Sequence, residues 1–312
     1  MTKQIVVLSD YERIYPSSPK VAELEKKGYS ITYHHHKITE EAEVVSLLKE
    51  ADIAVLIRER VNLSADVLKK LPSLQMISQT GGGAAHIDLD QAEKQGITIT
   101  LTGSTSRPSV VELTFGLMIA CARQFTPHQQ NLQQDKWIQY PGMELQNKRL
   151  GLLGYGKIAR EVALVAESFN IEVVAWRPTG KKGDEHISIL ELEEVLSTSD
   201  IVSVHLKLVP ELRGILNQQH LNLMKKGSIF INTARGALVD TKALVELLES
   251  GHLYGAGIDT FEEEPLVQNP FKNCPNVVLT PHIGYVTTEV LERFAEQSLQ
   301  NILDHDLKSE MK

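Results

Sequence analysis

The chain has 312 residues, of which 42% are hydrophobic and 23% are charged, and a formal net charge of −8 at pH 7. A chain of this length is more typical of two domains than of one domain with a single hydrophobic core. The acidic balance argues against nucleic acid as the main partner, and no apolar run approaches the roughly 18 residues of a membrane span. We therefore expect a protein that binds neither nucleic acid nor membrane.

The N-terminus and the cysteines indicate the compartment. Ile5–Leu8 is a short apolar run that ends at Ser9, and it is too short for the core of a signal peptide. The only cysteines of the sequence, Cys121 and Cys274, cannot make a disulfide framework. We expect a cytoplasmic protein.

Strands and helices alternate over about the first 100 residues. The predicted strands are Ile5–Leu8, Ile31–Tyr33, Ile53–Ile57, Gln75–Ser78 and Ile97–Thr100. The helical patterns between them are Val21–Lys27, Glu40–Glu50, Ala65–Leu71 and Leu89–Gln95. This alternation predicts an α/β domain whose parallel sheet is covered by helices on both faces.

Two loops of this half carry candidate substrate-binding residues. Gly81, Gly82 and Gly83 follow a predicted strand, and their backbone N–H groups suit a small carboxylate; a flexible turn is the alternative. Arg58 and Arg60 follow the preceding strand, at the same edge of the sheet. One of these arginines could contact substrate, and a solvated surface position is the alternative.

Three adjacent histidines, His34, His35 and His36, follow the second predicted strand. Successive residues of an extended segment point to opposite faces, so the three side chains cannot converge well on one ion. We expect no metal site there, and the rest of the sequence suggests none.

The middle of the chain contains a helix and then a polar segment. Pro108 fits the first turn of a helix that should cross from the first domain to the second. The polar segment 126–142 carries Trp137 and Tyr140 with little apolar company. An arm that packs on a neighbouring subunit would explain these aromatics, and a local cap over the second domain would explain them equally well.

A second alternation of strands and helices begins at Leu150 and predicts a second doubly wound parallel sheet of six strands. After Leu150 its strands are Val173–Trp176, Ile201–His205, Ser228–Asn232, Leu253–Ile258 and Val277–Leu279. A final helix from Thr287 has only the first domain left to pack on. We therefore expect the second domain to be inserted into the first.

The second alternation opens with a strand, a glycine turn and a helix. Gly154 and Gly156 let the backbone turn tightly after the apolar run around Leu152, and Ile158 begins the apolar face of the helix. The exposed N–H groups of such a helix suit the pyrophosphate of a dinucleotide. Ala159 stands at the third glycine of this fingerprint and still allows close packing. The pattern predicts a dinucleotide-binding turn.

The residue that follows the second strand of this domain predicts which dinucleotide binds. NAD-preferring folds place a carboxylate about 20 residues after the turn, where it accepts hydrogen bonds from the ribose 2′-OH. Arg177 stands there instead, and Lys181 and Lys182 add positive charge. A guanidinium would bind a 2′-phosphate, so we expect NADP(H) to be preferred over NAD(H). The alternative is that Arg177 stacks on the adenine or points to solvent.

Three later strand ends each deliver a polar residue to one edge of the second sheet. Arg235 follows one strand, Glu264 lies in the loop after the next, and His282 follows the last. A histidine, a carboxylate that raises its pKa and a cation that binds a substrate carboxylate form a working catalytic unit. Taken singly, each has a surface or loop role as its alternative.

The chain resembles the D-isomer-specific 2-hydroxyacid dehydrogenases over nearly its whole length. This family includes glyoxylate/hydroxypyruvate reductases and D-glycerate and D-3-phosphoglycerate dehydrogenases. The motifs that carry the resemblance are GLLGYGKIA (151–159), MKKGSIFINTARGALVD (224–240), GAGIDTFEEEPL (255–266) and LTPHIGYVT (279–287).

The resemblance implies the site residues. The catalytic residues would be Arg235, Glu264 and His282. The substrate would contact Arg58, Gly81, Gly82, Gly83, Arg235 and His282. The cofactor contacts would be Gly154, Tyr155, Gly156, Lys157, Ile158, Arg177, His205, Thr233, Ala234, Arg235, Asp259 and His282, with Asp259 beside the nicotinamide carboxamide. The family's usual Asp-Asn pair after the glycine loop is Ala85-His86 here.

The resemblance also implies an architecture. A flavodoxin-like substrate domain would comprise residues 1–101 and 284–312, and an NAD(P)-binding Rossmann domain would comprise residues 102–283. Members are commonly homodimers joined through the cofactor domain, which suits the aromatic segment at Trp137.

Two functions fit these expectations. The first is hydride transfer between NAD(P)H and a small 2-oxo acid or D-2-hydroxy acid. The second is an NAD(H)-sensing corepressor, because such binding proteins share the fold and keep the same three residues. The absence of a basic or disordered tail favours the enzyme, and the glutamate at position 264 argues against a formate dehydrogenase, which has glutamine there.

Overall fold

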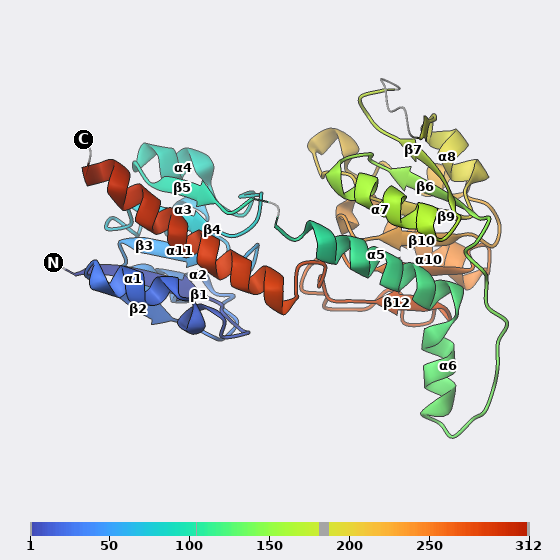
Figure 1. Cartoon of the computed structure of the whole chain (residues 1–312), viewed down its shortest axis with the longest axis horizontal. Coiled ribbons are helices and arrows are strands. Elements are labelled where there is room, and N and C mark those ends of the chain that lie inside the picture. Colours follow the sequence, from blue (N-terminus) through green and yellow to red (C-terminus); the bar gives the residue numbers. More distant parts are fainter. Residues whose placement is uncertain (1, 104, 181–186, 311–312) are drawn as a thin grey trace. The chain divides into compact units, whose positions relative to one another are not determined.

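The computed structural model describes residues 2–103, 105–180 and 187–310, and the chain divides into two compact units. Unit 1 comprises Met1–Ser106 and Val286–Lys312, and unit 2 comprises Arg107–Tyr285. Unit 2 is therefore an insertion in unit 1 (Figure 1). The predicted divisions lay a few residues earlier, at 101/102 and 283/284.

Unit 1 is built on a five-stranded parallel sheet in the order β2-β1-β3-β4-β5. Its strands are β1 (Lys3–Leu8), β2 (Tyr29–Tyr33), β3 (Ile53–Leu56), β4 (Met76–Gln79) and β5 (Thr98–Leu101). Its helices are η1 (Tyr15–Ser17), α1 (Lys20–Lys26), α2 (Glu41–Leu48), α3 (Ala65–Leu68), α4 (Leu89–Lys94) and α11 (Thr288–Glu310). This strand order is that of flavodoxin-like folds.

Both faces of the smaller sheet are buried, because apolar residues occupy successive positions of its central strands. On β1, Ile5 and Val7 pack with α1 and α11, whereas Val6 and Leu8 face the core under α2, α3 and α4. Figure 1 shows α1 and α11 together on one face of the sheet. Continuous apolar strands of this kind require helices on both sides.

The final helix completes unit 1, as its apolar stripe predicts. Ala295, Leu299 and Ile302 of α11 are fully buried in a cluster that also contains apolar residues of β1, β3 and β4. Two hydrogen bonds fix the helix at Ser298: Tyr15 Oη lies 2.9 Å from Ser298 Oγ, and Ser78 Oγ donates to the Ser298 carbonyl at 2.8 Å. The C-terminal helix therefore belongs to the core of the domain that begins the chain.

Unit 2 is built on a seven-stranded parallel sheet in the order β12-β11-β10-β9-β6-β7-β8. Its strands are β6 (Arg149–Leu153), β7 (Glu172–Trp176), β8 (Ser188–Ile189), β9 (Ile201–Val204), β10 (Ile229–Asn232), β11 (Gly255–Ile258) and β12 (Val277–Leu279). The order reverses between β6 and β9, as in a Rossmann fold, and ligands of such sheets bind at that reversal. The predicted fold class is confirmed.

Helices cover both faces of the larger sheet. The helices of unit 2 are α5 (Arg107–Ala122), α6 (Phe125–Leu132), α7 (Lys157–Ser168), α8 (Leu192–Thr198), η2 (Pro210–Leu212), α9 (Gln218–Leu221), η3 (Gly236–Leu238) and α10 (Thr241–Glu249). Helices α5 and α7 pack on one face, and α8 and α10 pack on the other.

Two predictions for unit 2 were wrong in detail. The sheet has a seventh strand, β8. Its 2 residues are too few to show the alternation of apolar and polar residues by which a strand is predicted. A helix was expected between β11 and β12, but residues 259–276 contain none. Pro265, Pro270 and Pro275 interrupt that connection, and proline removes the N–H group that a helix interior needs.

The segment after α5 extends away from the sheet of unit 2 (Figure 1). It consists of α6 and a loop that returns to Ala122, whose carbonyl accepts a hydrogen bond from Met143 N–H at 2.7 Å. Tyr140 N–H donates to His128 Nε2 at 2.9 Å, so this aromatic packs on α6. Trp137 stays 83% exposed, so the described residues of its own unit leave most of it uncovered.

Candidate active site

The three predicted polar residues of unit 2 lie in loops that follow adjacent strands. Strands β10, β11 and β12 are neighbours and run parallel, so their carboxyl ends lie at one edge of the sheet. Arg235, Glu264 and His282 occur in the loops that leave this edge. The strand pairing therefore brings together residues that are up to 47 positions apart in the sequence.

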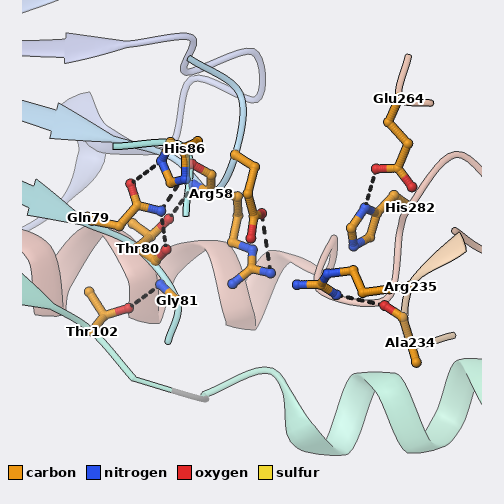
Figure 2. A network of polar contacts seen from close by, with 11 residues as sticks. Arg58, Gln79, Thr80, Gly81, His86, Thr102, Ala234, Arg235, Glu264 and His282 are labelled. Carbon is orange, nitrogen blue, oxygen red and sulfur yellow. Dashed lines mark hydrogen bonds and ion pairs between the residues drawn. The ribbon is translucent and has the colours of Figure 1, made fainter. Parts of the chain in front are cut away.

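Glu264 and His282 form a hydrogen-bonded pair. His282 Nδ1 lies 2.6 Å from Glu264 Oε2 (Figure 2). The other carboxylate oxygen accepts a hydrogen bond from Phe261 N–H at 2.8 Å. Burial alone would raise the pKa of Glu264, but the hydrogen bond and charge of His282 and the nearby charge of Arg235 lower it below its usual range. The ionised carboxylate of Glu264 orients the imidazole through its hydrogen bond to His282.

Arg235 is fixed by its own loop. The amide of Asn232 accepts a hydrogen bond from Ala234 N–H and donates one to the Arg235 carbonyl, both at 3.0 Å. Arg235 Nη1 donates to the Ala234 carbonyl at 2.7 Å (Figure 2). The guanidinium therefore leaves a loop whose backbone is already fixed, within electrostatic reach of the His282–Glu264 pair.

Asp259 has a contact set that the sequence did not predict. Its fully buried carboxylate accepts hydrogen bonds from Thr280 Oγ1 at 2.6 Å, Ile283 N–H at 2.8 Å and Gly284 N–H at 3.0 Å. Burial raises the pKa of Asp259 above its usual range, although these hydrogen bonds oppose the rise. Asp259 thus holds the loop that carries His282, whereas its contact with a nicotinamide carboxamide stays a prediction.

The dinucleotide turn has the backbone that its glycines predict. Gly154 has a φ of +95°, and a Cβ there would lie 2.9 Å from the His205 backbone. Gly156 is the N-cap of α7, and a Cβ there would meet open space. Ala159 is fully buried. The first N–H groups of α7 therefore face an unobstructed position at the sheet's reversal, which fits a pyrophosphate.

The other predicted cofactor contacts surround this turn. Tyr155 is buried, with the Arg160 guanidinium 4.7 Å from the centre of its ring, and Lys157 and Ile158 begin α7. His205 Nε2 lies 2.9 Å from Ser203 Oγ, and burial lowers the pKa of His205 to about 4, so its imidazole is neutral at pH 7. Thr233 Oγ1 contacts Thr114 Oγ1 of α5 at 3.2 Å.

Arg177 follows β7 directly and is half-buried. Its Nε donates to the Gly180 carbonyl at 3.2 Å, and Nη2 is buried without a hydrogen-bond partner in the part of the chain that the structure describes. A buried donor without a partner is costly unless a ligand satisfies it. Lys181 and Lys182, predicted to add charge here, lie outside the described residues.

The glycine loop of unit 1 corrects one expectation. Gly81 N–H donates to Thr102 Oγ1 at 2.8 Å and is therefore not offered to a ligand (Figure 2). A Cβ at Gly81 would collide with the Arg58 guanidinium, so that side chain lies directly on this glycine. Gly82 and Gly83 are exposed. Close packing with Arg58, rather than carboxylate binding, explains the first glycine.

A buried glutamine connects the two candidate loops of unit 1. Gln79 Nε2 donates to the carbonyls of Arg58 at 3.0 Å and Thr80 at 2.8 Å, and Gln79 Oε1 lies 3.2 Å from His86 Nε2 (Figure 2). Because both amide protons are used, His86 Nε2 must carry the proton of this bond. Burial lowers the pKa of His86, so its imidazole is neutral. His86 thus supports the loop.

Arg60 is engaged within unit 1. It donates to both carboxylate oxygens of Glu12, at 2.6 and 2.8 Å, and to the Ser9 carbonyl at 2.7 Å. Such a bidentate pair fixes a guanidinium strongly. Of the two candidate arginines, Arg58 is therefore the one that we keep as a substrate contact.

Across the described side chains of residues 2–103, 105–180 and 187–306, no three His, Cys, Asp or Glu are grouped so that they could hold a metal ion. Within the same described ranges, no helix has the length and apolarity needed to cross a bilayer.

Known proteins are similar to this chain in sequence and in fold. A family profile described as D-isomer specific 2-hydroxyacid dehydrogenase, NAD binding domain, matches residues 115–284. The hydroxypyruvate reductase of Thermotoga maritima is 35% identical over 89% of this chain and 92% of its own length. The glyoxylate reductase of Thermococcus litoralis is 34% identical over 82% of this chain and 81% of its own length. A crystal structure of a Thermus thermophilus protein, 34% identical, matches with a TM-score of 0.87 over 96% of both chains.

Proposed function

This chain belongs to the D-isomer-specific 2-hydroxyacid dehydrogenase family, and we propose that it interconverts a small 2-oxo acid and its D-2-hydroxy acid with NAD(P)(H). Members of the family use a nicotinamide cofactor and act on small 2-oxo and 2-hydroxy acids. The observation that carries the proposal is the 2.6 Å hydrogen bond between His282 and Glu264, on the sheet that also forms the dinucleotide turn.

We assign the cofactor to unit 2. The open position at Gly156, the N-terminus of α7 and the adjacent His205 backbone support binding of the pyrophosphate at the sheet's reversal. Tyr155, Lys157, Ile158, Thr233 and Ala234 would complete the contacts. The bound nicotinamide supplies or accepts the hydride.

We assign the substrate carboxylate to Arg235. A guanidinium binds a carboxylate through two parallel hydrogen bonds, which fixes the orientation of the carbonyl group. The N–H groups of Gly82 and Gly83 and the side chain of Arg58 are kept as further substrate contacts, in the unit that we propose to be the substrate domain.

His282 would act as the acid of the reduction. Its Nδ1 is held by Glu264, which leaves Nε2 as the atom that donates a proton to the carbonyl oxygen. In the reverse direction the neutral imidazole accepts the hydroxyl proton. The ionised carboxylate of Glu264 stabilises the imidazolium that donates.

The cofactor preference rests on Arg177. A 2′-phosphate would bring its negative charge to a half-buried guanidinium whose Nη2 lacks a hydrogen-bond partner among the described residues. The 2′-OH of NAD(H) is uncharged and cannot form an ion pair with that guanidinium. We therefore propose a preference for NADP(H).

The exposed apolar side chains of α6 and of the loop that follows it support a homodimer joined through unit 2. Their exposed fractions are 55% for Phe125, 57% for Leu132, 83% for Trp137, 44% for Ile138 and 40% for Tyr140. Exposed apolar patches of this kind usually mark interfaces. We propose that a second copy of the chain covers this segment.

Replacing His282 tests the reaction itself. His282→Ala should lower kcat by about 10²–10⁴-fold, because a general acid typically contributes that much. The assay follows NADPH or NADH loss with glyoxylate, hydroxypyruvate, pyruvate and longer 2-oxo acids. His220→Ala, which removes another histidine of unit 2, is the control and should keep wild-type activity. A His282→Ala enzyme within about threefold of wild type would refute the assignment.

Replacing Arg177 tests the cofactor preference. The wild type should have the higher kcat/KM for NADPH, and Arg177→Asp should reverse the ratio because a carboxylate repels the 2′-phosphate and accepts hydrogen bonds from the 2′-OH. Steady-state kinetics with both cofactors give the two ratios. A wild type that favours NADH, or an unchanged ratio in the mutant, would show that Arg177 does not set the choice.

Replacing Trp137 tests the homodimer. Loss of a large aromatic anchor costs about 2 kcal/mol or more at an interface, which weakens association by about 30-fold. Analytical ultracentrifugation should find a dimer for the wild type. Trp137→Ala should dissociate at protein concentrations at which the wild type is still dimeric. Val267→Ala removes another side chain of unit 2 that is 87% exposed and should leave association unchanged. A monomeric wild type would contradict the proposal.

A further inference from the structure

The side chain of Asn232 spans the loop that presents Arg235. Asn232 is the last residue of β10 and is only 2% exposed. Its Oδ1 accepts the Ala234 N–H, and its Nδ2 donates to the Arg235 carbonyl, both at 3.0 Å. One buried amide therefore fixes the peptide group before Ala234 and the peptide group after Arg235, so it spans both residues.

The other side of the loop is fixed by Gly236. A Cβ at Gly236 would collide with the backbone of Phe261 and Glu262, so the Arg235 loop lies directly against the turn that carries Glu264. The Arg235 backbone is thus held between the Asn232 amide and this turn. Arg235 Nη1 also donates to the Ala234 carbonyl at 2.7 Å. This hydrogen bond fixes the guanidinium to the loop backbone that Asn232 holds.

We propose that Asn232 is a positioning residue that sets the guanidinium of Arg235 for the substrate carboxylate. The proposal deepens the function proposed above and rests on it. The role requires a donor and an acceptor on one short side chain, which asparagine has. Aspartate keeps the acceptor but cannot donate to the Arg235 carbonyl, and serine is too short to reach both groups.

The effect should fall on carboxylate binding. Asn232→Asp should weaken oxamate, the unreactive amide analogue of a 2-oxo acid, by about tenfold when measured on the cofactor-loaded protein, because one hydrogen bond that orients the clamp is lost. KM should rise by a similar factor, with a smaller change in kcat and an unchanged cofactor Kd. Asn232→Ser, which buries no charge, should show the same pattern.

Ser228→Ala is the matched control. Ser228 is buried just before the other end of β10, and its hydroxyl has no hydrogen-bond partner in the described residues, so its loss removes no contact of the site. This variant should bind oxamate like the wild type. Thermal unfolding of all variants distinguishes loss of the clamp from loss of the fold.

A double-mutant cycle shows whether Asn232 acts through Arg235. If it does, Asn232→Asp should change kcat/KM by less than about twofold in an Arg235→Ala background, because the group that it positions is gone. An equal loss in both backgrounds, or wild-type oxamate affinity in both Asn232 variants, would overturn the inference alone. A wild type that neither binds oxamate nor reduces any 2-oxo acid would instead overturn the proposed function, and this inference with it.

Discussion

The buried carboxylate of Asp259 holds the loop on which the proposed acid stands. His282 has a φ of +54°, a backbone conformation that costs a non-glycine residue about 1–3 kcal/mol. Asp259 accepts three hydrogen bonds from residues on either side of His282, and these hold the loop in this conformation. These bonds hold the loop backbone on both sides of His282, and the hydrogen bond to Glu264 orients the imidazole itself.

The two carboxylates of the site affect stability in opposite ways. Burial raises the pKa of Asp259, so the folded protein holds that proton more tightly than the unfolded chain does, and ionised Asp259 reduces stability at neutral pH. The pKa of Glu264 is lowered, so its contribution is present at neutral pH and is lost as the pH falls through the carboxylate range. At neutral pH the burial of ionised Asp259 therefore lowers the free energy of unfolding, whereas the interactions of ionised Glu264 raise it.

The sequence predicts the features that follow from a periodic pattern of residues. It does not predict the features that depend on a single tertiary contact. The two parallel sheets and the dinucleotide turn at Gly154 follow from apolar periodicity and glycine spacing. Parallel pairing then brings Arg235 and His282 to one edge. The loop contacts of Asp259 and the internal bond of Gly81 could not be predicted, because they depend on tertiary distances. Asn232 left a signal, since an asparagine side chain at the end of a strand commonly bonds to the backbone two residues on.

The pH dependence of reduction in wild type and Glu264→Gln tests the His282–Glu264 pair most directly. The reduction needs a protonated imidazole, so kcat/KM falls as the pH rises through its ionisation. A neutral amide no longer stabilises the imidazolium, so this descending limb should move to lower pH by about one unit in Glu264→Gln. A descending limb at the same pH in both proteins would contradict the account, because Glu264 would then have no part in keeping His282 protonated.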